Sequence, residues 1–182
     1  PEWIHEDLMA HPEYRTVFWD EAQRLLFNGG AFTPERAQPI WDALAAQVDQ
    51  AVIGESIRWG NDLARARQSV WSAKIAQVRT NFFPTRTATV IAQLRQRNQY
   101  PATAAPTFNS YGGIVPAGFL LFMTNSVPGS TLYYALDGAV PRVRGNGVNP
   151  VALAYSPGTP ITINAQTTLK ARIRSGTSWS AM

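Results

Sequence analysis

The segment Thr131–Gly138, TLYYALDG, decides the fold of the second half of this chain. Apolar and aromatic residues alternate along it, so a strand here would carry Leu132, Tyr134 and Leu136 on one face and Tyr133 on the other. The strand ends at an Asp-Gly pair, which is typical of a turn that needs a positive φ at the glycine. The segment therefore predicts a half-buried strand that closes in a tight turn.

The acid of this pair is either a catalytic group or a turn residue. Asp137 is the only carboxylate after Asp62, so its half of the chain offers no second acid to act with it. Glycosidase chemistry needs two carboxylates. We therefore predict that Asp137, Gly138 and Pro141 form a structural turn, in which the Asp side chain bonds to the backbone.

Short runs with a period of two recur over the last seventy residues or so, separated by Gly, Pro and Asn. Such spacing predicts a small β-sandwich. In one of these runs, alternation turns Lys170, Arg172 and Arg174 outward as a solvated face or a basic binding surface. The expected strands are Ile114-Val115, Phe119–Thr124, Thr131–Leu136, Val151–Tyr155, Ile161–Asn164, Leu169–Arg174 and a last strand at Trp179.

The first hundred residues follow a helical period instead. One helix is expected to begin at Pro12 and to stop at Gly29-Gly30. A second begins at Thr33-Pro34, with the threonine as N-cap, and Pro39 either splits this helix or kinks its first turn.

A third helix is expected from Gln68 to Phe82, and a fourth from Pro84 to Asn98. Four helices with short joints predict a small antiparallel bundle. The fold class is therefore α+β with two domains. A helical bundle (1–100), a linker (101–111) and a β-sandwich (112–182) follow one another.

The ends and the composition of the sequence indicate what kind of polypeptide it belongs to. The chain begins with Pro1 and ends within an expected strand at Met182, so we expect a piece of a longer polypeptide whose last strand is truncated. The sequence has 182 residues, no cysteine and no apolar run long enough to span a membrane.

Charge is distributed unevenly. Residues 1–62 carry eleven acids against four arginines, whereas residues 63–100 carry seven bases and no acid. These two blocks neutralise each other if the segments pack together; the alternative is a basic face for an anionic polymer. The bases are dispersed singly, which disfavours nucleic acid as a partner.

Chemistry-bearing residues are few. The two histidines, His5 and His11, do not have the spacing of a zinc site. His11 precedes Pro12 and suits a helix entry, and His5 suits the surface. Glu55, Arg58 and Asp62 can form a local ion network on one helix face. No catalytic residue, metal or cofactor is therefore predicted.

Aromatic side chains offer an alternative function. Tyr133, Tyr155 and Trp179 are the candidates in the β half for stacking on a sugar, if their rings are exposed. Most other tryptophans lie at helical spacing, where core positions are more common.

A family resemblance in the β half is carried by Ile114-Val115, Thr131–Gly138, Pro141-Arg142, Tyr155, Pro160-Ile161 and Thr168–Arg172. With these residues the β half resembles the chitobiase/β-hexosaminidase C-terminal-type module, an immunoglobulin-like or fibronectin type III-like sandwich. Ala135 and Ala139-Val140 depart from the usual polar residues of that family.

A second resemblance, in the helical half, is carried by His11–Arg15, Phe27–Gly30, Glu55-Ser56, Arg58–Gly60, and Phe82–Pro84 with Arg86. With these residues the helical half resembles the C-terminal helical region of bacterial proteins related to the spore-coat protein H kinase-like family (CotH-like).

Together the two resemblances imply an exported bacterial protein, with the chain outside the cytoplasm or at the cell surface. They imply a non-catalytic connector whose partner is an upstream, kinase-like domain of the same polypeptide, with adhesion to a surface protein as a further role. The alternative is a carbohydrate-binding accessory module whose partner is a polysaccharide.

Overall fold

The computed structural model describes residues 2–59 and 67–182, and it confirms a mixed α and β fold. Contacts divide the chain into two compact units. The first unit holds Pro1–Gln23 and Leu94–Met182, and the second holds Arg24–Gln93. The domains predicted from the sequence (1–100 and 112–182, with a linker between them) have other boundaries than these contact units, and the domain division stays a prediction.

The first unit combines two N-terminal helices with every strand of the chain that the structure describes. Its helices are α1 (Glu2–Met9) and most of α2 (Pro12–Leu26). Its strands are β1 (Thr107–Phe108), β2 (Phe119–Leu121), β3 (Met123–Thr124), β4 (Thr131–Ala135), β5 (Leu153–Ala154), β6 (Ile161–Ile163), β7 (Lys170–Ser175) and β8 (Ser178–Trp179).

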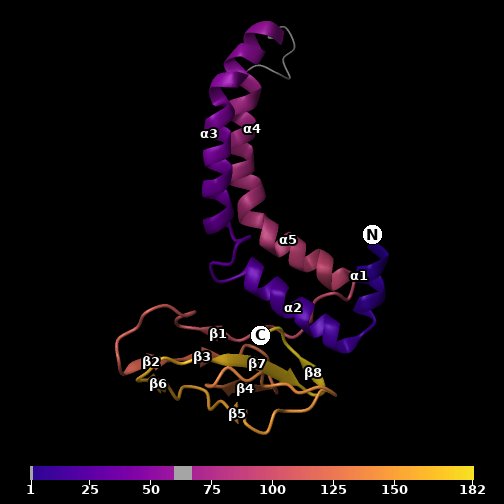
Figure 1. The fold of residues 1–182 in the computed structure, drawn as a ribbon, viewed down its shortest axis with the longest axis vertical. Helices are drawn as coiled ribbons and strands as arrows, with labels where there is room; N and C mark the ends of the chain where they lie inside the picture. Colours follow the sequence, from indigo (N-terminus) through magenta and orange to yellow (C-terminus); the bar gives the residue numbers. More distant parts are fainter. Residues whose placement is uncertain (1, 60–66) are drawn as a thin grey trace. The chain divides into compact units, whose positions relative to one another are not determined.

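These strands form three antiparallel sheets, which Figure 1 shows as the orange to yellow arrows. Strands β1 and β3 pair, β2 and β6 pair, and the largest sheet has the order β5-β4-β7-β8. In the largest sheet Leu132 lies opposite Ile173, and Tyr133 lies opposite Arg172.

One apolar cluster holds the sheets together. Leu132 of β4 and Ile173 of β7 are 2% and 0% exposed, and they pack with Met123 of β3. Phe108 of β1 and Ile161 of β6 complete the cluster, so each sheet contributes to it. The alternating pattern correctly placed Leu132 and Tyr134 toward the core, whereas Leu136 is 39% exposed and the strand already ends at Ala135.

Three expectations about strands were wrong. Phe119–Thr124, expected as one strand, forms β2 and β3, which belong to different sheets. Ile114-Val115 forms no strand, and the Ile114 side chain is fully exposed after two glycines at positive φ. Conversely, Thr107–Phe108, in the range expected to be a linker, forms β1. A strand of two residues has no periodicity that a sequence pattern can detect.

The second unit contains a helical hairpin. Helix α3 (Pro34–Trp59) runs beside a helical run made of η2 (Arg67–Trp71), α4 (Ser72–Gln77), η3 (Val78–Phe82) and α5 (Phe83–Gln96), as Figure 1 shows. Trp71 donates to Asp49, and Arg79 pairs with Asp42 at 2.6 Å. As residue numbers rise along one helix they fall along the other, so the two are antiparallel.

The predicted start of α3 is confirmed. Thr33 precedes Pro34, and its carbonyl accepts bonds from the N–H groups of Arg36 and Ala37. The stop before it is also explained, because a Cβ at Gly30 would lie 2.2 Å from the Arg24 carbonyl oxygen. Pro39 lies within α3 and does not split it.

The predicted break between the third and fourth helices was wrong. The chain is helical without interruption from Arg67 to Gln96, and the stretch before Pro84 is a π-helix. The Phe83 N–H bonds to the Val78 carbonyl five residues earlier, which widens the turn. Because this wider turn accommodates a residue that lacks an N–H, Pro84 is tolerated inside the run.

Candidate functional site

The outer face of the β4-β7-β8 sheet is covered rather than solvated. Alternation directs Tyr133 and Arg172 away from the apolar cluster, as predicted. However, Arg172 is 1% exposed and is among the largest fully buried side chains. The expectation of a solvated or basic stripe at this position was therefore wrong, because another element of the first unit covers it.

Helix α2 provides the partner of Arg172. One guanidinium nitrogen donates to Asp20 of α2, and the other terminal nitrogen donates to the Ser180 carbonyl at 2.8 Å. Asp20 also accepts a bond from the Met182 backbone N–H at 3.0 Å. The Asp20 carboxylate thus holds both β7 and the chain beyond β8.

A second charge pair lies about two helical turns earlier on the same helix. Arg142 donates from both terminal nitrogens to the two carboxylate oxygens of Glu13, at 2.6 and 2.9 Å. Such bidentate geometry fixes orientation as well as distance. We refer to Glu13, Asp20, Arg142, Arg172 and Met182 as the α2–sheet joint.

The electrostatics of the joint differ between its two pairs. Burial raises the pKa of Asp20, against the opposing effect of Arg172, and burial lowers the pKa of Arg172. At Glu13 the hydrogen bond from Arg142 lowers the carboxyl pKa. Desolvation is therefore costly at the inner pair and offsets much of the attraction between its two charges.

Tyr100 adds a third link to α2. Its hydroxyl donates to the Gln23 side chain, and Arg95 lies over its ring at 5.6 Å from the centroid. Burial raises the pKa of Tyr100 to about 12, so the hydroxyl remains a donor at neutral pH. Three positions on α2, spread over Glu13 to Gln23, are thus bonded to residues that follow α5.

The residues predicted as a structural turn lie together. The Asp137 carboxylate accepts a bond from the Ala139 N–H at 2.9 Å, and the Gly138 N–H donates to the Thr168 carbonyl at 2.8 Å. Gly138 has φ +82°. Pro141 is fully buried, and its carbonyl accepts a bond from Asn149.

The three aromatic residues considered for sugar stacking differ in exposure. Tyr155 lies in the core cluster at 8% exposure, and its hydroxyl accepts a bond from the Met123 N–H. Trp179 is 3% exposed, with its indole N–H on the Asn146 carbonyl. Neither ring offers an open face, which removes both as stacking platforms. Tyr133 is half-buried and contacts Trp179, with ring centroids 5.9 Å apart.

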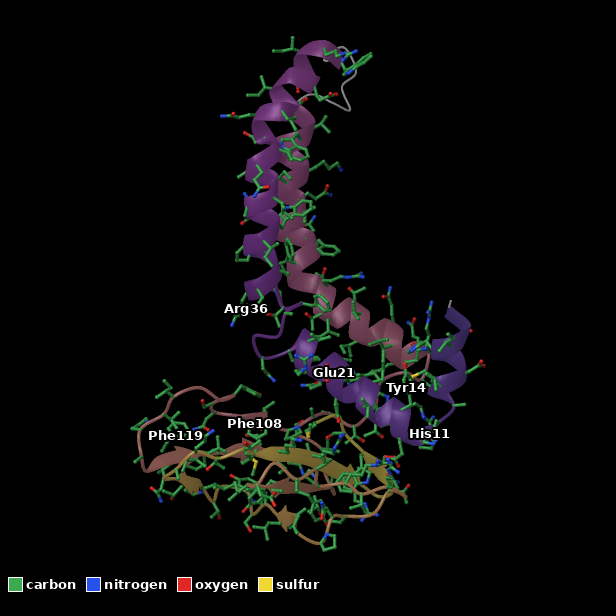
Figure 2. The ribbon with its side chains drawn as sticks, in the orientation of Figure 1. His11, Tyr14, Glu21, Arg36, Phe108 and Phe119 are labelled. Atoms are coloured by element: carbon green, nitrogen blue, oxygen red, sulfur yellow. The ribbon has the colours of Figure 1, made fainter. Side chains whose placement is uncertain are left out.

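The histidines have structural partners. His11 lies at the start of α2 (Figure 2), and its ring accepts a bond from the Glu13 N–H, as expected of a helix entry. His5 was expected at the surface, yet it is half-buried against Tyr14 and Phe18. Within residues 2–59 and 67–182, no group of three or more His, Cys, Asp or Glu can hold a metal ion. Asp62 of the proposed ion network lies outside the described residues, as does Gly60 of the helical resemblance.

Two hollows mark the surface of the first unit. One, with a volume of about 690 Å³, is mainly apolar and lies at the end of the β-rich part where Figure 2 labels Phe108 and Phe119. The other, about 1040 Å³, borders the α2–sheet joint. Among the residues that line the second are Arg15, Trp19, Arg142 and Arg144.

Comparison with family models, with curated proteins and with solved structures finds no match for this chain. Among the helices that the structure describes, none is long and apolar enough to cross a membrane.

Sequence analysis missed the joint. The acidic block of the helices does pair with the following basic block at Asp42 and Arg79, as one hypothesis expected. Glu13 and Asp20 instead pair with arginines more than a hundred residues away. The available signal was the nearly acid-free β half, in which a buried base has almost no carboxylate of its own half to pair with.

Proposed function

We propose that the chain is a non-catalytic connector, in which α2 and the β-rich part act as one rigid element while α3 presents an apolar face to a neighbouring domain. The α2–sheet joint carries this proposal. It links a helix near one end of the sequence to strands near the other through two arginine–carboxylate pairs. Both acids of the joint are paired with an arginine, so we assign them a role in holding α2 on the sheet rather than in proton transfer.

The finer architecture belongs to the same proposal. The core cluster draws residues from all three sheets, which favours an immunoglobulin-like sandwich of the chitobiase C-terminal type over three independent hairpins. The CotH-like relationship of the helical part, and an extracytoplasmic or cell-surface location, remain predictions from resemblance.

Helix α3 supports the docking part of the proposal. It contains no buried residue. Its Ile40, Leu44 and Val48 follow one another every four residues and are 62%, 54% and 44% exposed. Residues at this spacing share a helix face, and exposed apolar faces often mark protein contacts. We call these three residues the α3 stripe, and we assign it to an upstream domain of the same polypeptide.

Rigidity of the joint is testable with paired spin labels. The sequence has no cysteine, so Val17→Cys on α2 and Leu153→Cys on β5 give two unique labelling sites, both exposed. The proposal expects one narrow distance distribution, which broadens when Arg172→Met and Arg142→Gln are added. A broad distribution in the otherwise unchanged chain would refute a rigid element.

Docking of the α3 stripe is tested separately. The upstream segment of the polypeptide, produced as its own fragment, should bind the 182-residue chain in calorimetric titration. Changing the α3 stripe to serine should abolish this binding, whereas the control Val151→Ser, also at an exposed apolar residue, should not. Unchanged binding by the stripe variant would contradict the assignment.

A further inference from the structure

The cleft beside the α2–sheet joint carries an excess of positive charge that the protein itself does not use. Arg15, Arg142 and Arg144 line it, together with one acid, Glu13. Arg142 is already bound to both oxygens of Glu13, so this pair is neutral. Arg144 lies close enough to Glu13 to act on its charge but forms no salt bridge with it, and Arg15 forms none among the described residues, so three guanidinium groups face a single carboxylate in the cleft.

Unpaired hydrogen-bond donors occur in the same wall. The indole N–H of Trp19 and the Nε–H of Arg15 are shielded from water and have no partner in the described part of the chain. Both residues line the cleft, and they lie four positions apart on α2. Buried donors are nearly always satisfied, so two unsatisfied donors in the wall of a cleft suit acceptor atoms from a ligand, which reach them once the two side chains turn toward the cleft.

The size and the remaining lining indicate the ligand class. At about 1040 Å³ the cleft is at the upper end of the range for small-molecule sites, and it is larger than a single inorganic ion needs. Hydroxyl groups of Thr103 and Ser178 and the amide of Asn146 complete its wall. Guanidinium groups bind carboxylates bidentately, and hydroxyl and amide groups suit sugar hydroxyls.

We propose that this cleft binds an acidic oligosaccharide, with Arg15 and Arg144 holding its carboxylates and the Trp19 indole donating to a sugar oxygen. The site does not use Tyr133 or Tyr155, and it does not depend on the α3 stripe. It is therefore independent of the connector function, and either proposal stands if the other fails.

Calorimetric titration of the 182-residue chain with tetragalacturonate tests the proposal. Saturable binding is expected at low salt, with weakening as salt screens the charges. The fully methyl-esterified tetrasaccharide, which keeps the ring hydroxyls but lacks the charge, should bind at least about tenfold more weakly.

Three variants locate the site. Arg15→Gln and Arg144→Gln should each weaken tetragalacturonate binding about tenfold or more. Trp19→Phe keeps an aromatic ring but removes the N–H, so it should weaken binding while leaving the melting temperature unchanged. Arg97→Gln removes an equal charge from an exposed residue that does not line the cleft, and it should have no effect.

Several results would overturn the proposal. These are absence of saturable tetragalacturonate binding, equal binding of the methyl ester, and unchanged affinity in both the Arg15 and Arg144 variants. Competition arms with tetraglutamate and with inorganic phosphate distinguish the other anion sources. Tighter binding of either one than of tetragalacturonate would assign the cleft to an acidic peptide or to a free anion instead.

Discussion

The sheet β5-β4-β7-β8 and the helical hairpin of α3 use their side chains in opposite ways. In the two central strands of the sheet, β4 and β7, side chains are covered on the core face and on the outer face, and Arg172 of β7 is 1% exposed. In the hairpin, α3 has no buried residue, and Ile57 near its end is 82% exposed. A sheet with two covered faces is stabilised from within its own unit, whereas two paired helices leave apolar surface for another partner.

The largest expected effect lies at the buried ion pair. Arg172→Met leaves Asp20 charged, buried and without its cation, which should cost about 3–5 kcal/mol of unfolding free energy in urea titrations. Adding Asp20→Leu removes the orphaned charge and should recover at least half of this loss.

Lys170→Met, two residues earlier on β7, is the matched control and should stay within about 0.5 kcal/mol of the parent. A double variant as unstable as the single one would show that the cost does not come from an unpaired charge.

The same substitution, leucine to alanine, in the sheet core and on α3 compares how much each region depends on buried side chains. Leu132→Ala in the sheet core should cost about 2–5 kcal/mol because the side chain is 2% exposed. Leu44→Ala on α3, where the side chain is 54% exposed, should change the unfolding free energy by less than about 0.5 kcal/mol. Equal losses would mean that the α3 stripe is buried in solution, for example by self-association.

A smaller effect is expected at the turn that follows β4. Gly138→Val should cost about 1–3 kcal/mol, because its φ of +82° strains a branched side chain and its Cβ would lie 3.3 Å from Thr168 Cγ2. Gly158→Val is the control, since it has φ +81° and nothing within 4 Å of the added Cβ.

The difference in melting temperature between these variants isolates the contact with Thr168 from the backbone strain. Asp137→Asn keeps an acceptor for the Ala139 N–H and should be neutral. If Gly138→Val has the same melting temperature as the parent, neither the backbone strain nor the contact with Thr168 destabilises the fold.

The smallest effect concerns pH. The folded-state pKa of Glu13 lies below its ordinary value of 4.5, so the pair with Arg142 contributes stability above pH 4.5. This contribution disappears as the pH falls through the lowered pKa. Urea midpoints measured on acidification should therefore decline less steeply in Glu13→Gln than in the parent.

Glu6→Gln, at an exposed acid of α1, serves as the control and should follow the parent curve. If Glu13→Gln and Glu6→Gln give the same slope, the outer pair of the joint does not form in solution.

Helix starts and strands that depend on neighbouring residues alone were predicted correctly. Pro12, Thr33 and Pro34 mark helix starts through capping and ring geometry, and alternation located β4, β6 and β7 within a residue or two. The continuous helix across Pro84 was not predicted. Pro84 is tolerated because a π-helical turn precedes it, and no residue type indicates such a turn.

The joint could not be predicted in the same way. The outward direction of Arg172 follows from alternation along β7, but its burial depends on α2, which lies far away in the sequence. The same limit applies to Trp179, which was a candidate for stacking on a sugar and is 3% exposed in the folded chain. A period of two specifies which face a side chain joins, and only the tertiary fold specifies what covers that face.

The separation of Asp20 from Arg172, 152 positions, also has a consequence for biosynthesis. At ordinary translation rates, α2 leaves the ribosome about 8–30 s before β7 exists to bind it. During that time Asp20 has water instead of an arginine, and the helix has no sheet to cover. The joint therefore cannot close until β7 has been made, and the core contacts of the earlier strands can form before it.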